Sequence, residues 1–228
     1  MTEVTRLRLR ITFHKEGALK YIGHLDLAKI WERVLRRAQI HLAYSQGFNA
    51  RPKMQFASPL SLGCTSEAEL IDVWLEGGSL TPEEITAIAQ KLATVSPVGL
   101  VIRRTESVPE RTPALPTLVR RAHYTATLEA PQPDLTLRVS TLMAQPTILR
   151  TRKEKTYDLR PLIVALHAVD DRHLTMILAA QEHAGVGRPD EVLEALGFDP
   201  LSAALHRTAL ELDTSLTTLS PSPALEQE

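Results

Sequence analysis

The sequence contains a single cysteine, Cys64, among its 228 residues. One thiol cannot form an intramolecular disulfide, and it cannot supply the several thiolates that a zinc site or an iron–sulfur cluster takes from one chain. His24 has no second histidine or thiol beside it at a spacing typical of metal ligands. We therefore expect no metal and no cofactor in this chain, and its cysteine content fits a reducing compartment best.

Long apolar runs and net charge are missing as well. No stretch approaches the roughly 18 consecutive apolar residues of a membrane-spanning helix, and residues 1–10 lack the apolar core of a signal peptide. Lys and Arg number 26 against 27 Asp and Glu, so the whole molecule lacks the basic balance of a nucleic-acid-binding domain. We expect a cytoplasmic protein with no membrane partner, in which any nucleic-acid signal is local.

What is present predicts an α+β fold over residues 1–105. Apolar residues alternate in the strand-like segments and recur at three- and four-residue steps in the helical ones. Thr81 and Glu84 form a capping box around Pro82, which predicts the start of a helix. The expected elements are strands at 7–14, 41–46, 71–75 and 98–103, and helices at 25–38 and 81–93. This order, βαββαβ, is the ferredoxin-like arrangement.

The second half is expected to repeat that order in degenerate form. Prolines interrupt the periodicity over residues 106–117, which predicts a stiff linker. A second ferredoxin-like lobe follows over 118–213, so the two lobes resemble a duplication, with chance similarity as the alternative. Its expected elements are strands at 122–130, 147–152, 173–180 and 203–212, and helices at 134–143 and from Arg188. The tail, 214–228, is rich in Ser, Thr and Pro and is expected to be disordered.

Charge is segregated along the chain. Residues 1–57 contain 11 Lys and Arg against 4 Asp and Glu, a net of +7, whereas residues 58–100 contain 1 against 6, a net of −5. Within the first helix, four cations recur opposite the apolar stripe and predict one exposed basic face. They are Lys29, Arg33, Arg36 and Arg37. Such a face suits phosphates, or it is a solvated exterior that supports solubility.

The loop after this helix combines side chains that could bind nucleic acid. Amide, hydroxyl, aromatic and cationic groups lie within ten residues, a mixture that can stack a base and donate to phosphates. The candidate binding residues are Ser45, Gln46, Phe48, Asn49, Arg51 and Lys53, with Gly47 providing backbone freedom. The alternative is a long β-hairpin with Phe48 packed under the sheet.

Other residues of this region are candidates for structural or catalytic roles. Asp26 is expected to cap the first helix or to meet its dipole, and Pro59 and Gly63 are expected to shape the following loop. His24 could serve as an acid, a base or a phosphate donor, because its charge changes near neutral pH. A smaller basic cluster lies in the second half. Its cations are Arg150, Arg152, Lys153, Lys155 and Arg160, and with the acids Glu154 and Asp158 its net charge is +3.

Several motifs together resemble the radical SAM-linked protein family, a domain of unknown function. They are Tyr21-Ile22-Gly23-His24-Leu25-Asp26, Arg36-Arg37-Ala38, Ser45-Gln46-Gly47-Phe48-Asn49, Phe56-Ala57-Ser58-Pro59-Leu60, Ser66-Glu67-Ala68-Glu69, Asp158-Leu159-Arg160-Pro161, Arg188-Pro189-Asp190-Glu191 and His206-Arg207-Thr208. The resemblance is densest in the first half and extends to about residue 212. It implies a domain fused to, or encoded beside, a radical SAM protein, often near ribosome and RNA-processing genes.

The departures from the family pattern affect the expected chemistry. Ala50-Arg51-Pro52 stands where the family commonly has Pro-His-Pro, and Gly23 replaces a usual serine. Arginine favours binding of phosphate or carboxylate over proton transfer. A radical SAM enzyme needs three cysteine ligands for its cluster, so this chain could be a companion of such an enzyme but not the enzyme itself.

Three hypotheses follow. The first is a non-catalytic companion of a radical SAM enzyme that binds RNA or presents an RNA or ribonucleoprotein substrate. The second is an RNA-cleaving or RNA-modifying enzyme, similar to the ferredoxin-like CRISPR repeat endonucleases, with His24 as acid or base. The third is a protein–protein module whose acidic strand, Glu67, Glu69, Asp72 and Glu76, docks a partner.

Overall fold

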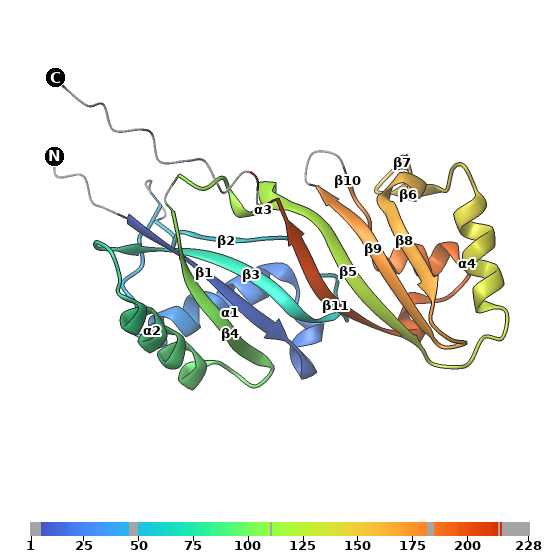
Figure 1. The fold of residues 1–228 in the computed structure, drawn as a ribbon. Coiled ribbons are helices and arrows are strands. Elements are labelled where there is room, and N and C mark those ends of the chain that lie inside the picture. The colour runs from blue at the N-terminus through green and yellow to red at the C-terminus, as the bar shows by residue number, and fades with distance from the viewer. Residues whose placement is uncertain (1–5, 46–49, 110, 182–184, 214, 216–228) are drawn as a thin grey trace, which may run out of the picture.

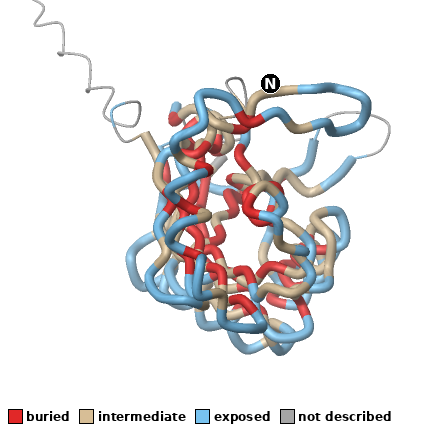
Figure 2. The backbone as a smooth tube through the Cα atoms, turned by 90° about the vertical axis from the view of Figure 1, so that its right-hand side faces the viewer, coloured by how far each residue is buried: buried red, intermediate tan, exposed pale blue. Residues whose placement is uncertain are grey.

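The computed structural model describes residues 6–45, 50–109, 111–181, 185–213 and 215. They form an α+β molecule whose N-terminal half, blue to green in Figure 1, lies beside the C-terminal half, yellow-green to red. Buried stretches of the backbone run through the interior, and exposed stretches form the outer turns (Figure 2). Among the described residues, no helix is long and apolar enough to cross a membrane.

The N-terminal half contains four strands and two long helices. The strands are β1 (Arg6–Lys15), β2 (Met54–Phe56), β3 (Thr65–Glu76) and β4 (Leu100–Val108); the helices are α1 (His24–Arg37), α2 (Pro82–Val95) and the short 3-10 helix η1 (Gly17–Tyr21). The strands pair antiparallel in the order β4-β1-β3-β2. The two middle strands, β1 and β3, are the first and third along the chain.

The C-terminal half has a matching set of long elements. They are the strands β5 (Val119–Leu128), β8 (Ile163–Ala168), β9 (His173–Gln181) and β11 (Ala203–Leu212), and the helices α4 (Leu135–Ala144) and α5 (Pro189–Ala195). These strands also pair antiparallel, in the order β11-β5-β9-β8. The short elements are α3 (Leu115–Leu118), β6 (Leu149–Arg152), β7 (Lys155–Asp158), η2 (Arg160–Leu162), β10 (Gly185–Val186) and η3 (Pro200–Ser202).

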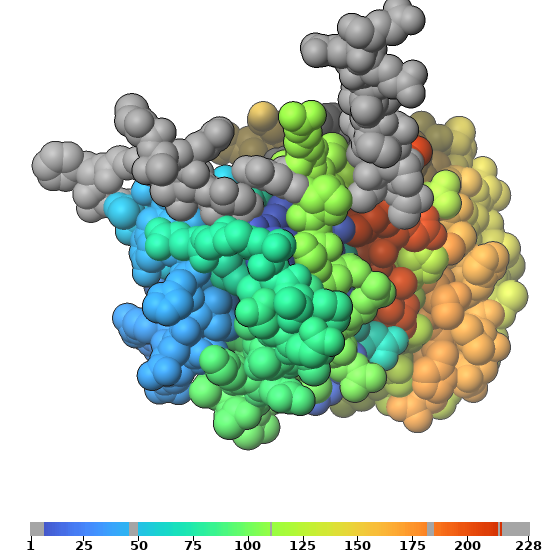
Figure 3. Space-filling model, turned by 60° about the vertical axis from the view of Figure 1, so that its left-hand side comes forward, coloured from blue at the N-terminus to red at the C-terminus, as the bar shows by residue number. Residues whose placement is uncertain are grey.

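A parallel pair joins the two halves into one nine-stranded sheet. His206 and Arg207 of β11 pair with Thr65 and Ser66 at the start of β3, while β2 pairs with residues 71–73 further along the same edge. Because β3 is long, one of its edges pairs with β11 of the C-terminal half near its start and with β2 of the N-terminal half further along. Figure 3 shows the two halves in direct contact, blue and green atoms beside red and orange ones.

The local sequence explains these elements. Leu9, Ile11 and Phe13 of β1 are fully buried, and the Phe13 ring packs edge-on against Trp31 of α1 with 4.9 Å between ring centroids. The capping box that the sequence predicts is confirmed, because the backbone N–H of Glu84 donates to Oγ1 of Thr81 and the Glu84 carboxylate accepts from the Thr81 N–H. Apolar alternation and capping thus place α1 and α2 against one face of the sheet.

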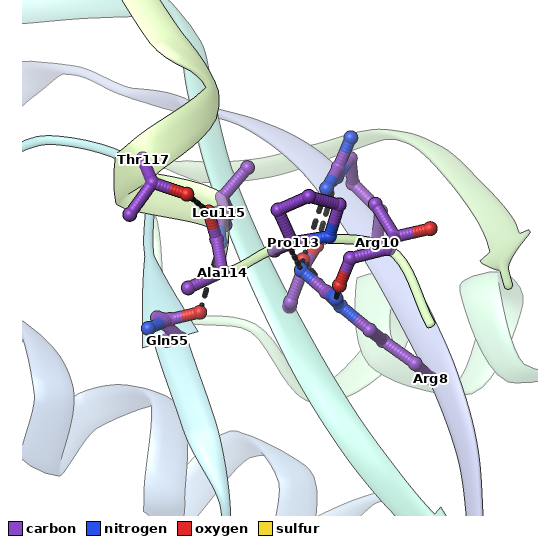
Figure 4. Close-up of polar contacts among 9 residues, drawn as sticks. Arg8, Arg10, Gln55, Pro113, Ala114, Leu115 and Thr117 are labelled. Atoms are coloured by element: carbon purple, nitrogen blue, oxygen red, sulfur yellow. Dashed lines mark hydrogen bonds and ion pairs between the residues drawn. The ribbon is translucent and has the colours of Figure 1, made fainter. Parts of the chain in front are cut away.

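The opposite face of β1 and β3 carries buried charge. Arg8 and Arg10 of β1 both donate to the carboxylate of Asp72 in β3, with N–O distances from 2.5 to 3.0 Å, and all three side chains are buried. The Arg8 guanidinium also donates to the carbonyls of Thr112 and Pro113. The proline-rich segment expected to be a linker is therefore held against this face (Figure 4).

Gln55 of β2 fixes the same segment at its end. Its Oε1 accepts from the backbone N–H of Leu115 at 3.0 Å, and Leu115 and Leu118 of α3 are fully buried. Residues 111–118 consequently run over the sheet as part of the packed structure, rather than away from it.

The element boundaries correct the sequence-based expectations in three places. The strand expected at 41–46 is replaced by isolated bridges of Leu42 and Tyr44, and the regular edge strand is β2 at Met54–Phe56. The strand expected at 147–152 belongs to the separate β6–β7 hairpin. Its place in the sheet is taken by β8, which the sequence analysis missed. The tail expected over 214–228 lies outside the described residues, except for Ser215.

Candidate functional site

The basic face of α1 is exposed, as its spacing predicts. Leu27, Trp31, Val34 and Leu35 are buried against the sheet, which turns the cations to solvent. Lys29, Arg33, Arg36 and Arg37 are all exposed. The helix therefore presents a cationic stripe opposite its apolar one.

The first turn of α1 differs in detail from the expectation. Gly23 occupies the N-cap position and no side chain caps the helix, so Asp26 lies inside the first turn and faces the positive helix end instead. Its carboxylate also accepts from Nζ of Lys29 at 2.9 Å, and both side chains are largely exposed. Among the described residues, Arg33, Arg36 and Arg37 form no ion pair. Three of the four cations are therefore available to an anionic ligand.

The base of the candidate loop lies close to the C-terminal part of α1. One cavity of about 290 Å³ is lined by Arg36, Tyr44 and Pro52, with the acidic Glu32 also in its lining. Oγ of Ser45 accepts from the backbone N–H of Arg51 at 3.0 Å, which closes the loop base and leaves the Arg51 side chain exposed. Gln46, Gly47, Phe48 and Asn49 lie outside the described residues. The structure thus brings Arg36 and the two described ends of the loop together.

Lys53 has a different environment from the other loop cation. Its ammonium lies 4.6 Å from the centroid of the Trp74 ring, and the guanidinium of Arg8 lies 5.0 Å from the same ring. This cation–π contact holds the Lys53 ammonium against Trp74 of β3. Arg51 is therefore the loop cation that is best placed to meet a ligand beside Arg36.

The basic cluster of the second half is separate from α1. Its residues lie on and after the β6–β7 hairpin, beside α4 in the other half of the molecule (Figure 1). The guanidinium of Arg150 pairs with the carboxylate of Glu194 in α5. These cations therefore do not extend the surface of α1.

A buried ion pair at the junction of the halves was missed by the sequence analysis. Arg207 of β11 and Glu69 of β3 are 0% and 3% exposed, and Nε and Nη2 of the arginine donate to the two carboxylate oxygens at 2.8 and 2.6 Å. The neighbouring Glu69 and the Tyr124 hydroxyl raise the pKa of Arg207 against the effect of burial. Arg207 thus remains a cation inside the protein.

Arg207 also shapes the loop that precedes β3. Its guanidinium donates to the backbone carbonyls of Ser58 at 3.2 Å and Pro59 at 3.4 Å. Gly63 of this loop has a φ of +83°, a conformation that favours glycine, and its N–H donates to the carbonyl of Lys20 before α1. Pro59 and Gly63 thus each make a backbone hydrogen bond to another segment of the chain.

Lys15 and Cys64 complete this buried cluster. Nζ of Lys15 donates to the carbonyl of Ile22, immediately before α1, and burial lowers the pKa of this lysine. Burial also raises the pKa of the Cys64 thiol to about 12, so this thiol is neutral and unreactive at physiological pH. Glu69 and Asp72 are buried in ion pairs, so the acidic strand expected to dock a partner exposes only part of its charge.

The central pocket lies next to this cluster, between the two halves, because Ser58 and Pro59 contact Arg207 and also line the pocket. It has a volume of about 560 Å³ and is bounded by α1 and β2 on one side and by β9 and β10 on the other. His24, Gln55, Phe56, Ser58, Pro59 and Val186 are among its lining residues. The His24 ring packs edge-on against Phe56 with 5.0 Å between centroids, and burial lowers the pKa of His24. Among the described residues of this lining, His24 is the one titratable side chain.

Four of the motifs quoted above converge at this junction. The segments around His24, Ser58, Glu69 and Arg207 are distant in the sequence, but the Arg207 guanidinium contacts the second and third directly. Positions 69 and 207 are 138 residues apart, so no local pattern could have predicted that they pair.

Fold and site define an α+β protein with one continuous sheet, an exposed basic helix and a pocket between its halves. The chain belongs to the bacterial family described as "Uncharacterized protein conserved in bacteria (DUF2344)", whose model matches residues 8–189. No curated protein matches the chain. The family description names no radical SAM enzyme and no RNA, so the family match carries no information on either partner.

Proposed function

We propose that this protein binds RNA through the basic face of α1 and the adjoining end of the 44–53 loop. The observation that carries the proposal is the group of three exposed arginines without an acidic partner among the described residues, Arg33, Arg36 and Arg37. An unpaired surface guanidinium gains most from a phosphate, because it can donate two parallel hydrogen bonds to the oxygens.

The surroundings of these arginines support an anionic ligand. Arg51 lies at the described end of the loop whose base shares a cavity with Arg36. Arg8, Arg10 and Lys15, three other cations of residues 1–57, are buried and contribute little charge to the surface. The positive charge of residues 1–57 is thereby concentrated on α1, which suits a local contact with a phosphate backbone rather than a general attraction to anions.

A binding experiment with matched charge removal tests this function. Fluorescence anisotropy with labelled ribosomal or transfer RNA should give binding that weakens with salt. In Arg33→Ala/Arg36→Ala/Arg37→Ala the affinity should fall, and the slope of log K against log salt should become shallower by about 2, since each lost phosphate contact removes roughly 0.7 to 0.9.

The control for charge alone is Lys91→Ala/Arg103→Ala/Arg104→Ala, which likewise removes three exposed cations, from α2 and β4. This variant should retain the affinity and nearly all of the salt slope. Equal losses in both variants would show a diffuse electrostatic attraction, and RNA binding that ignores salt would contradict the proposal. Gel analysis of the same RNA tests for cleavage, for which His24 is the candidate residue.

The resemblance of the motifs to radical SAM-linked proteins supports a second part of the proposal, that the chain acts beside a radical SAM enzyme and presents the RNA to it. Co-purification of the tagged chain with a protein that contains a three-cysteine cluster motif tests this partnership. Recovery of the chain without such a protein, from cells that express both, would contradict it.

We also propose that the two halves are degenerate copies of one ferredoxin-like unit. In each half the order of the long elements is βαββαβ, and the first and third strands lie in the middle. Superposition of the halves in an experimental structure tests this origin. A match confined to single helices or hairpins would contradict it.

A further inference from the structure

The central pocket is mostly apolar but contains three polar side chains. Phe56, Met54, Pro59, Pro116 and Val186 supply apolar surface, and His24, Gln55 and Ser58 supply polar atoms. A mainly apolar cavity with a few convergent hydrogen-bonding groups is the usual form of a site for a small organic group. Its volume of about 560 Å³ lies within the range for such sites.

Each polar side chain retains hydrogen-bonding capacity toward a ligand. Oε1 of Gln55 is occupied by the N–H of Leu115, which leaves the amide NH₂ as a donor. The Ser58 hydroxyl and both ring nitrogens of His24 have no hydrogen-bond partner among the described residues. Because burial lowers the pKa of His24, its ring is neutral at pH 7 and offers one donor and one acceptor.

Among the described residues, the pocket lining offers no counter-charge to an ionic occupant. The described lining contains no Lys, Arg, Asp or Glu. Arg207 and Glu69, which lie under the Ser58–Pro59 loop, are paired with one another and are fully buried. A phosphate or carboxylate would find no counter-charge here, whereas an uncharged ring with polar edges would find both apolar surface and hydrogen-bonding groups.

The pocket and the basic face share one helix. His24 and Ala28 of α1 line the pocket, and Lys29 and Arg33 follow on the same helix. At a rise of about 1.5 Å and a turn of about 100° per residue, Arg33 lies about 14 Å along the axis from His24 and on the opposite side of the helix. A single-stranded segment of several nucleotides that follows the surface of α1 can therefore place one base in the pocket while more distant phosphates of the same strand reach the cations.

We propose that the central pocket receives one unstacked base of the bound RNA, held between Phe56 and the proline-lined wall and hydrogen-bonded by His24, Gln55 and Ser58. This inference rests on the proposed RNA-binding function and adds to it the class of group that is recognised. Base stacking on aromatic side chains is tolerant of sequence, and the polar edge provides the means of selecting among bases.

The test compares a short single-stranded RNA with the same sugar–phosphate chain without bases. The two have equal charge, so the basic face binds both alike, and the difference in affinity reports the base. The wild-type chain should bind the abasic oligonucleotide roughly 5- to 150-fold more weakly, which is the range for loss of one stacked base. Val186→Phe, which fills the pocket, should reduce that ratio toward 1.

Val164→Phe is the matched control, because Val164 and Val186 are exposed to nearly the same extent, 43% and 42%, and Val164 lines a different cavity. Thermal unfolding of both variants establishes that they are folded. If either variant is unfolded, NMR titration of the wild-type chain with a free nucleoside replaces it, and shifts at His24 and Gln55 are the expected result.

The outcomes separate the two proposals. Salt-dependent RNA binding with equal affinity for the abasic chain, or a ratio unchanged in Val186→Phe, overturns the pocket and leaves RNA binding in place. Binding of a free nucleoside at His24 and Gln55 without any binding of RNA supports the pocket as a site for a heteroaromatic ring and overturns the proposed function.

Discussion

At the scale of single residues, the Arg207–Glu69 pair is a buried contact between β11 of one half and β3 of the other. Both side chains are buried, and the guanidinium also holds the carbonyls of Ser58 and Pro59. A buried ion pair contributes little net stability relative to apolar residues, but removal of one partner leaves an uncompensated charge. The two kinds of substitution should therefore behave very differently.

We expect Arg207→Met to destabilise the protein by about 3 to 5 kcal/mol, because it leaves the Glu69 carboxylate buried and unpaired. Arg207→Met/Glu69→Leu should recover much of that loss. Urea denaturation measures both variants. Lys29→Ala, which breaks the exposed pair with Asp26, serves as control and should change the unfolding free energy far less. A double variant as unstable as the single one would show that packing rather than charge is responsible.

The buried thiol of Cys64 predicts a dependence on alkaline pH. Burial raises its pKa from 9.0 to about 12, so the folded protein binds this proton more tightly than the unfolded chain does. The stabilisation from this group is complete below pH 9 and is lost as the pH rises from 9 toward 12. By pH 10 the loss should reach about 1.4 kcal/mol.

Cys64→Ala isolates this contribution, because the variant should lose stability less steeply between pH 8.5 and 10 than the wild type does. The thiol offers an independent readout. In the native protein it should react with a thiol reagent only at the rate of unfolding, so rapid labelling at pH 8 under native conditions would contradict the assigned burial.

At the scale of elements, local patterns were sufficient where one segment determines its own structure. The capping box at Thr81 and the alternation of β1 predicted their elements, and the spacing of the α1 cations predicted their exposure. The edge strand β2 could not be located in this way, because it is only three residues long and carries no alternation of its own. Its position depends on pairing with residues 71–73 of β3.

The candidate site likewise contains some residues that local patterns predict and others that they do not. Lys29, Arg33, Arg36 and Arg37 could be predicted from helical periodicity alone. The partners of Glu69 and Asp72 could not, because each pairs with an arginine more than 60 residues away, and the protein–protein hypothesis assigned both acids to a docking strand. Burial of a charge is a property of the tertiary structure, and a count of charges along the chain does not contain it.

At the scale of the whole molecule, the halves share more than a connecting segment. β11 pairs with β3, and the Arg207–Glu69 pair crosses the junction. The hydrophobic core of the C-terminal half also includes Ala57, Leu60 and Cys64 from the N-terminal half. The core of the N-terminal half consists of its own residues, but the C-terminal half completes its core only with residues of the other half, which argues for a single cooperative unit.

We expect one unfolding transition for the full chain. Both tryptophans, Trp31 and Trp74, lie in the N-terminal half, so their fluorescence reports on that half, whereas far-UV circular dichroism reports on both. The two signals should give the same midpoint in urea. In Arg207→Met, where the junction is weakened, the midpoints should separate. A wild-type fluorescence transition that is complete while much of the dichroism signal persists would show instead that the halves fold independently, and that the pairing of β3 with β11 contributes little to their coupling.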